Sequence, residues 1–227
     1  MARASDAPPL PRVYRLLFKR FGSQHWWPAL SKRYRREEVC LGAILTQNTA
    51  WTNVEKAFTG LRDAGWLDLR RLASAPLQDI ARAIRPAGYF NQKALRIRAF
   101  AHYAESHGGL RRLLTQEIAP LRAELLALKG IGPETADSMI LYAADLPVFV
   151  VDAYTRRILA RLGATAPDAS YAELQDFCTS RLPRAAAIFN EFHALLVRLA
   201  KEHCTKRRPR CESCPLTRAC LKRLAAA

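Results

Sequence analysis

The stretch that decides the fold is LRAELLALKGIGPETADSMILYAA, residues 121–144. Apolar residues recur at helical spacing on both sides of segment 129–133, which predicts two helices joined by a tight turn. The two glycines of the turn permit positive φ angles and close approach. Backbone N–H groups at the start of the second helix, with the helix dipole behind them and Lys129 beside them, would suit one phosphate group. A plain helix–helix corner has a similar pattern, so both interpretations stay open here.

Helical periodicity continues outward from this hairpin in both directions. The clearest apolar stripe consists of Ile188, Phe192, Leu195, Leu196 and Leu199, and Gly163 has the position of a helix stop. The one strand-like run is VFVV at 148–151, and no partner strand of comparable strength exists, so we expect a buried extended connector there. The sequence therefore predicts an all-α fold of about ten short helices.

The composition indicates a polyanionic partner. The chain has 227 residues with 36 Lys and Arg against 20 Asp and Glu, a net charge of +16. This excess is larger than solubility requires and favours a nucleic acid. Hydrophobic residues make up 50% of the chain, which excludes a disordered basic tail. No apolar stretch reaches the roughly 18 residues of a membrane span, and the first residues have no apolar signal core. We therefore expect a cytoplasmic protein of the bacterial cytosol or nucleoid.

Four of the six cysteines crowd near the C-terminus with the spacing C-x6-C-x2-C-x5-C; they are Cys204, Cys211, Cys214 and Cys220. In a reducing cytosol such a group predicts a metal centre rather than disulfides. Tetrahedral zinc accepts four thiolates. The unequal spacers favour a [4Fe–4S] cluster, which holds its thiolates farther apart, and zinc stays as the alternative.

The remaining cysteines and the residues between the clustered ones have different expected roles. Cys40 and Cys178 are isolated on helical patterns, so we expect them to be small core residues. Between the first two clustered cysteines lie Lys206, Arg207, Arg208 and Arg210. A metal site would fix this basic loop at the surface, where it would bind DNA phosphates, and a solvated charge run is the alternative.

Asp152 follows the apolar run and precedes the helical segment AYTRRIL. An Asp in this position ordinarily caps the N-terminus of a helix. An apolar connector that leads to the mouth of a cleft would also place the carboxylate where it stabilises a cationic sugar or activates a water molecule. One residue can serve both roles.

Together these residues resemble the helix-hairpin-helix DNA glycosylases of the endonuclease III type over most of the chain. The elements that carry the resemblance are LKGIG (128–132) with Thr135 and Ala136, Val151 and Asp152 with Arg157, and the four-cysteine loop. The resemblance implies that Asp152 is catalytic and that the cysteines hold a [4Fe–4S] cluster, which we expect to be structural. It also implies that Gln47 fills the gap left by an extruded base.

The resemblance further implies two lobes: a helical barrel at 35–148 that carries the hairpin, and a lobe made of 1–34 and 149–227 that carries the cluster. We expect a monomer that binds bent double-stranded DNA across the cleft between the lobes and flips a damaged nucleotide toward Asp152. Lys129, Gly130 and Gly132 of the hairpin and the basic loop would contact phosphates, which makes the affinity fall steeply with salt.

One departure from the family decides the expected chemistry. Bifunctional members carry a lysine two residues beyond the second hairpin glycine, and this sequence has Glu134 there. Because the amine that would attack the sugar is absent, we predict a monofunctional glycosylase of base excision repair without AP-lyase activity.

Several strings look most like the 3-methyladenine DNA glycosylase III branch: HWWP (25–28), LTQNT (45–49), RPAGYFNQK (85–93) and GIGPETAD (130–137). An alkylated purine is cationic and suits aromatic faces, so Trp26, Trp27 and Glu134 are candidate pocket residues. At least one tryptophan is alternatively core, and Glu134 a solvent-facing acid. That branch need not keep the four cysteines, so an oxidised or deaminated base is the alternative substrate. A DNA-binding protein that uses the same hairpin and basic loop to bind lesions without chemistry is the alternative function.

Overall fold

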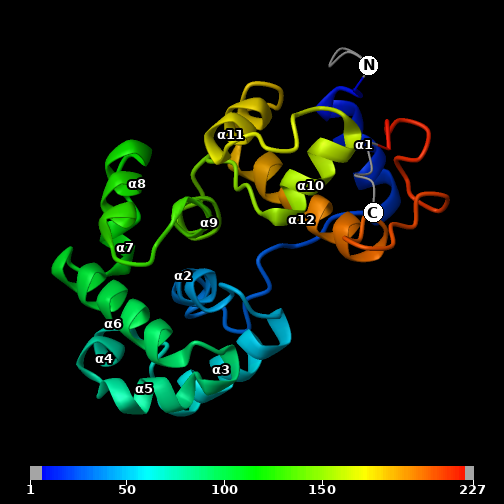
Figure 1. The fold of residues 1–227 in the computed structure, drawn as a ribbon. Coiled ribbons are helices and arrows are strands. Elements are labelled where there is room, and N and C mark those ends of the chain that lie inside the picture. The colour runs from blue at the N-terminus through cyan, green and yellow to red at the C-terminus, as the bar shows by residue number, and fades with distance from the viewer. Residues whose placement is uncertain (1–6, 223–227) are drawn as a thin grey trace. The chain divides into compact units, whose positions relative to one another are not determined.

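The computed structural model describes residues 7–222, which form helices joined by loops (Figure 1). No strand occurs in this part of the chain, so the predicted all-α class is confirmed. The helices are α1 (Leu10–Phe21), α2 (Arg35–Leu45), α3 (Trp51–Asp63), α4 (Leu69–Ser74), α5 (Leu77–Ala83), the 3₁₀ helix η2 (Arg85–Ala87), α6 (Phe90–Ser106), α7 (Leu110–Leu113), α8 (Ile118–Ala127), α9 (Pro133–Tyr142), α10 (Ala153–Leu162), α11 (Tyr171–Thr179) and α12 (Ala186–Glu202).

Residues 7–222 thus contain twelve α-helices rather than about ten. The difference arises because α4, α5 and α7 have only 6, 7 and 4 residues, too few for an apolar stripe to repeat along the sequence. None of the described helices is both long and apolar enough to cross a membrane. The outermost parts of the predicted second lobe, residues 1–6 and 223–227, lie outside the described residues.

One compact unit spans Trp27–Leu146 and contains α2 to α9. Within it, α6 packs against α4 and α5, and both α2 and α8 pack against α9. Its interior includes the buried side chains of Leu41, Ile44, Phe58, Leu61 and Phe100. The hairpin formed by α8 and α9 therefore stands on a packed helical scaffold.

A second compact unit combines Met1–Trp26 with Pro147–Ala227. Its described part contains α1, α10, α11 and α12, and α12 packs against both α1 and α10. Residues 148–151 are buried and form neither helix nor strand, which confirms the expected connector. This connector delivers the chain to Asp152, directly before α10.

The two isolated cysteines are core residues, as predicted. Cys40 on α2 and Cys178 on α11 are both fully buried. Burial raises the pKa of the Cys178 thiol to about 12, so this thiol stays protonated and unreactive at neutral pH.

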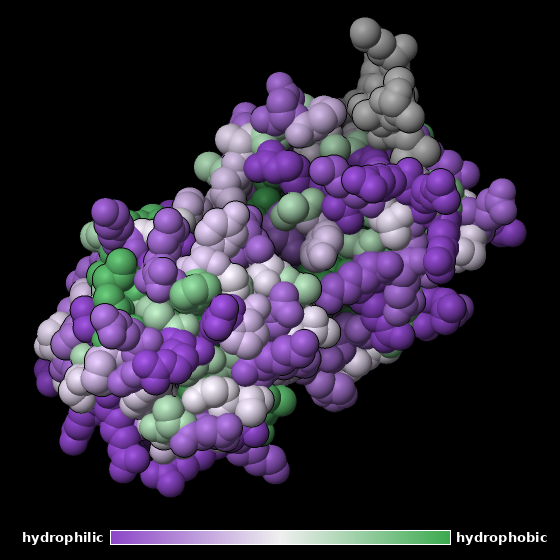
Figure 2. All heavy atoms as spheres, turned by 60° about the horizontal axis from the view of Figure 1, so that its bottom comes forward, coloured by the Kyte–Doolittle hydropathy of each residue, from purple (hydrophilic) through white to green (hydrophobic). Residues whose placement is uncertain are grey.

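The surface is predominantly hydrophilic on the face that Figure 2 presents, where apolar side chains form only small, separate patches. Large hydrophobic side chains that are exposed in the described part are Phe18, Leu30, Tyr89 and Leu95. Single exposed residues of this kind are ordinary, but one of them, Tyr89, lies on strained backbone.

Candidate active site and DNA-binding hairpin

An ion pair inside the hairpin fixes its two helices against each other. Arg122 of α8 donates from Nε to Oδ1 of Asp137 (2.7 Å) and from Nη2 to Oδ2 (3.1 Å), and Asp137 is fully buried on α9. A two-point contact of this kind restricts geometry more than a single hydrogen bond does. The sequence does not indicate this pair, because nothing local to either residue points to the other.

The two glycines of the turn have different roles. Gly130 has φ +87°, and a Cβ atom there would lie 2.2 Å from Nε of Arg96. Gly132 has φ −95° and ψ 178°, an ordinary extended conformation, and a Cβ atom there would meet nothing within 4 Å. The left-handed conformation predicted as an option for both glycines is therefore used by Gly130 alone. At Gly132 the absent side chain leaves open space in front of α9.

The N-terminus of α9 is also open. Pro133 occupies its first turn, and no side chain caps the helix, in contrast to α10 and α11, which have side-chain caps. Lys129 is exposed in the turn. Uncapped N–H groups beside a lysine form an arrangement that suits an anion.

Gln47 lies against this turn. Its Nε2 donates to the carbonyl oxygen of Gly130 (3.1 Å) and to Oγ1 of Thr135 (2.9 Å), and its Oε1 accepts a hydrogen bond from Arg96. The structure thus brings the predicted Gln47 to the predicted hairpin. It adds Arg96, which the sequence does not single out because one Arg on a basic helix forms no pattern.

Two further residues on this side of the unit were missed. Lys93 is buried and donates from Nζ to the carbonyl oxygens of Leu45 and Ala87, both at 2.8 Å; burial lowers its pKa to about 8. It ties the segment before Gln47 to the segment before Tyr89. Tyr89 is 67% exposed and has a left-handed backbone conformation with φ +45°, and backbone strain of this kind clusters at functional sites.

The candidate pocket residues lie in different surroundings. Trp27 is buried, and its ring packs against Trp51 and Tyr142 with 5.3 Å between centroids in each case, so the core interpretation applies to Trp27. Trp26 is half-buried and belongs to the other compact unit. Glu134 is exposed in the first turn of α9, where an acid is favoured by the helix dipole.

Asp152 caps α10, as predicted: its Oδ1 accepts a hydrogen bond from the backbone N–H of Thr155 at 2.7 Å. Its Oδ2 lies 3.6 Å from Nε2 of His193 on α12, and 13% of its side chain is exposed. Burial opposes ionisation, but the electrostatic attraction of His193 and the hydrogen bond from the backbone N–H of Thr155 outweigh it and lower the pKa of the carboxyl. The result is a carboxylate that is ionised at neutral pH and still accessible.

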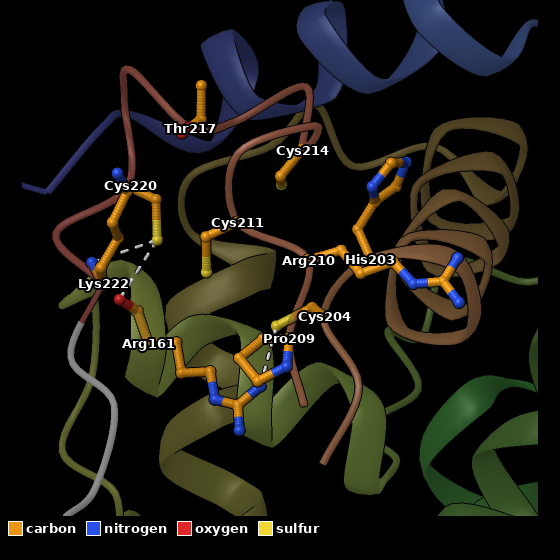
Figure 3. A pocket seen from close by; sticks show the side chains of 10 residues that line it. All are labelled: Arg161, His203, Cys204, Pro209, Arg210, Cys211, Cys214, Thr217, Cys220 and Lys222. Atoms are coloured by element: carbon orange, nitrogen blue, oxygen red, sulfur yellow. Dashed lines mark hydrogen bonds between the residues drawn. The ribbon is translucent and has the colours of Figure 1, made fainter. Parts of the chain in front are cut away.

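The four clustered cysteines line one cavity, together with Arg161 and His203 (Figure 3). Burial raises the pKa of Cys214 and of Cys220, and the neighbouring cysteines raise it further, as expected for thiols that approach one another. Within the described ranges, no three His, Cys, Asp or Glu side chains are close enough together to hold a single metal ion. The structure therefore brings the four thiols to one cavity.

Arginines of α10 fasten the cysteine loop to the helix that Asp152 caps. Arg157 donates from Nε to the carbonyl oxygen of Cys204 at 2.9 Å. Arg161 donates to the carbonyl oxygens of Thr205 (2.7 Å) and Lys206 (2.9 Å). The predicted phosphate-binding residues of this loop are exposed: Lys206, Arg207, Arg208 and Arg210.

Residues 41–184 match the HhH-GPD superfamily of base excision DNA repair proteins. The chain belongs to this superfamily. A protein of Methanocaldococcus jannaschii that is provisionally named a DNA repair glycosylase is 39% identical, over 93% of this chain and 96% of its own. The predicted family is thus confirmed, and the protein is a base excision DNA glycosylase of the HhH-GPD type.

Solved structures of the superfamily share the fold. The H. pylori 3-methyladenine DNA glycosylase bound to 1,N6-ethenoadenine is 27% identical, with a TM-score of 0.73 over 85% of this chain and 96% of that one. A non-covalent endonuclease III–DNA complex has a TM-score of 0.81 over 98% and 97% of the two chains at 22% identity, a likeness that concerns the fold alone. These likenesses confirm the predicted two-lobe architecture.

Proposed function

We propose that this protein is a monofunctional DNA glycosylase that flips a damaged base out of double-stranded DNA and hydrolyses its N-glycosidic bond, with an alkylated purine such as 3-methyladenine as the substrate. The observation that carries this proposal is the Asp152 carboxylate, which its surroundings keep ionised and which retains an exposed part. The 27% identity to a 3-methyladenine DNA glycosylase supports the substrate class.

In this proposal the carboxylate acts on the sugar rather than on the base. An N-alkylated purine carries positive charge and leaves as a neutral base, so its departure requires little acid catalysis. Positive charge then develops on the sugar, where a fixed carboxylate stabilises it or activates the attacking water. Because Oδ1 of Asp152 accepts the capping hydrogen bond from Thr155, Oδ2, which His193 faces at 3.6 Å, would be the oxygen that acts on the sugar.

The reaction would stop at an intact abasic site. Glu134 stands at the position of the family's lyase lysine and is exposed, and a carboxylate cannot form a Schiff base. Lys93 has the lowered pKa that suits a nucleophilic amine, but its buried Nζ is committed to two carbonyl oxygens. Neither residue supplies an accessible amine.

DNA affinity would come largely from phosphate contacts. The uncapped start of α9, the open space at Gly132 and the exposed Lys129 support one phosphate position at the hairpin. The exposed basic loop at 206–210 supports further contacts, and their electrostatic character would make binding fall steeply with salt. Gln47 would leave its contacts with the turn to fill the gap after base flipping.

Cys204, Cys211, Cys214 and Cys220 would hold a structural [4Fe–4S] cluster. That the four side chains line one cavity supports this proposal. Zinc holds its thiolates about 2.3 Å from one ion, whereas in the four-iron cluster each thiolate binds a separate iron and the thiolates lie farther apart, which suits the unequal spacers between these cysteines. Iron and acid-labile sulfide analysis should give about four of each per chain, and stoichiometric zinc instead would contradict the assignment.

A panel of duplexes, each with one lesion, tests the proposed activity. We expect free base to be released from duplexes with alkylated purines, strand breaks only after hot alkali, and no covalent complex after borohydride treatment, because Glu134 replaces the lysine that would form a Schiff base. Release of oxidised or deaminated bases alone would favour the endonuclease III-like alternative. Tight binding to an abasic analogue without any excision would favour a lesion-binding protein. Strand nicking that one lysine substitution abolishes would refute the monofunctional assignment.

A further inference from the structure

His193 is a buried polar residue whose surroundings within its own unit are specific. It lies on α12 with 7% of its side chain exposed. Its ring meets that of Phe149 nearly edge-on, with 6.5 Å between centroids. Its Nε2 faces Oδ2 of Asp152 at 3.6 Å. The connector, α10 and α12 therefore bring together one aromatic wall, one carboxylate and one imidazole.

The two carboxylate oxygens of Asp152 are held from different directions. The backbone N–H of Thr155 holds Oδ1 at hydrogen-bond distance, a contact that any N-cap makes. His193 faces Oδ2, which capping does not require. The 3.6 Å separation is an electrostatic contact rather than a full hydrogen bond, and contacts of this kind often shorten when a substrate closes the site.

We propose that His193 is a positioning residue for the reaction: it fixes the direction of Oδ2 of Asp152 and preserves the negative charge of the carboxylate that faces the sugar. This inference rests on the proposed function of Asp152. A histidine that serves only to fill the core has no need to face a carboxylate, and a neutral apolar residue in its place would leave a largely buried charge without its partner.

The test compares His193→Leu, His193→Gln and the matched control Phe189→Leu. Phe189 is buried on the same helix and packs edge-on against Phe149 with 5.6 Å between centroids, so its replacement disturbs the same wall without removing a polar group of the pair. We expect His193→Leu to slow single-turnover base release about tenfold while the affinity for an abasic-site duplex stays within about twofold. We expect His193→Gln, which can place a donor near Oδ2, to recover part of the rate.

A second measurement does not depend on activity. Because His193 lowers the pKa of Asp152 against the effect of burial, we expect His193→Leu to raise the pKa of that carboxyl, followed by carbon-detected NMR, whereas Phe189→Leu leaves it unchanged. An equal rate loss in His193→Leu and Phe189→Leu, or an unchanged pKa of Asp152 in His193→Leu, would overturn the inference. Full activity of Asp152→Asn would refute the proposed function instead, and slow Asp152→Asn with fully active His193 variants would refute this inference alone.

Discussion

The Asp152→Asn variant is expected to release the damaged base about 10²- to 10⁴-fold more slowly than the parent protein. Asn also accepts the N-cap hydrogen bond that Thr155 donates to Asp152, so α10 keeps its start. The substitution removes the charge that would stabilise the sugar cation or activate the water. Single-turnover release from an alkylated duplex measures the effect, and the thermal midpoint shows whether folding is intact.

Asp176→Asn is the matched control for this experiment. Asp176 is exposed on α11 of the same compact unit, so the same chemical change there should leave the rate unaltered. If Asp152→Asn released base as fast as the control, the catalytic role of Asp152 would be wrong, and Asp152 would be a helix cap only.

The net charge predicted the class of partner but could not identify the residues that meet it. Several arginines donate to carbonyl oxygens of the protein itself: Arg35 to Tyr142, Arg157 to Cys204, Arg161 to Thr205 and Lys206, and Arg198 to Phe21. These guanidinium groups hold loops and helix ends in place, so they stabilise the structure as well as contribute to the positive electrostatic potential. The excess of +16 therefore overstates the number of side chains that are free to contact phosphates.

What the sequence predicted well is local along the chain. The hairpin, the Asp152 cap and the buried connector each depend on residues within one or two helical turns. The helical periodicity of apolar residues and the preference of Gly and Asp for helix ends therefore indicate them directly. What it missed depends on contacts between distant segments: Arg122 with Asp137, Arg96 with Gln47, and His193 with Asp152. No periodicity or cap preference indicates such pairs, because the packing of the helices alone brings them together.

Trp27 is a predicted pocket residue whose actual role also depends on contacts between distant segments. An aromatic pair suited a stacking pocket by residue type, but the burial of Trp27 against Trp51 and Tyr142 depends on how α2, α3 and α9 pack. Gly42 on α2 belongs to this arrangement, since a Cβ atom there would lie 3.1 Å from the Trp27 ring. Residue type predicted that Trp27 makes an aromatic contact, but only the tertiary structure identifies the partners, Trp51 and Tyr142.

Alanine substitutions at the two hairpin glycines are expected to have the second large effect, and comparing them distinguishes a loss of DNA binding from a loss of stability. In Gly132→Ala the new methyl group fits an ordinary backbone conformation and meets no protein atom within 4 Å, so the free energy of unfolding should change by no more than about 1 kcal/mol. The methyl group would occupy the space through which a phosphate reaches the start of α9. We therefore expect DNA affinity, measured at constant salt with an undamaged duplex, to fall about tenfold.

Gly130→Ala is expected to reduce the stability of the fold. A left-handed conformation at φ +87° costs a residue with a Cβ atom about 1–2 kcal/mol, and the methyl group would displace the Arg96 side chain from its contact with Gln47. Its thermal midpoint should therefore fall below those of the parent and of Gly132→Ala. Unchanged DNA affinity in a folded Gly132→Ala protein would show that no phosphate binds at this turn, and the hairpin would then be a structural corner. Equal destabilisation of both variants would instead show that the space at Gly132 is not open in solution.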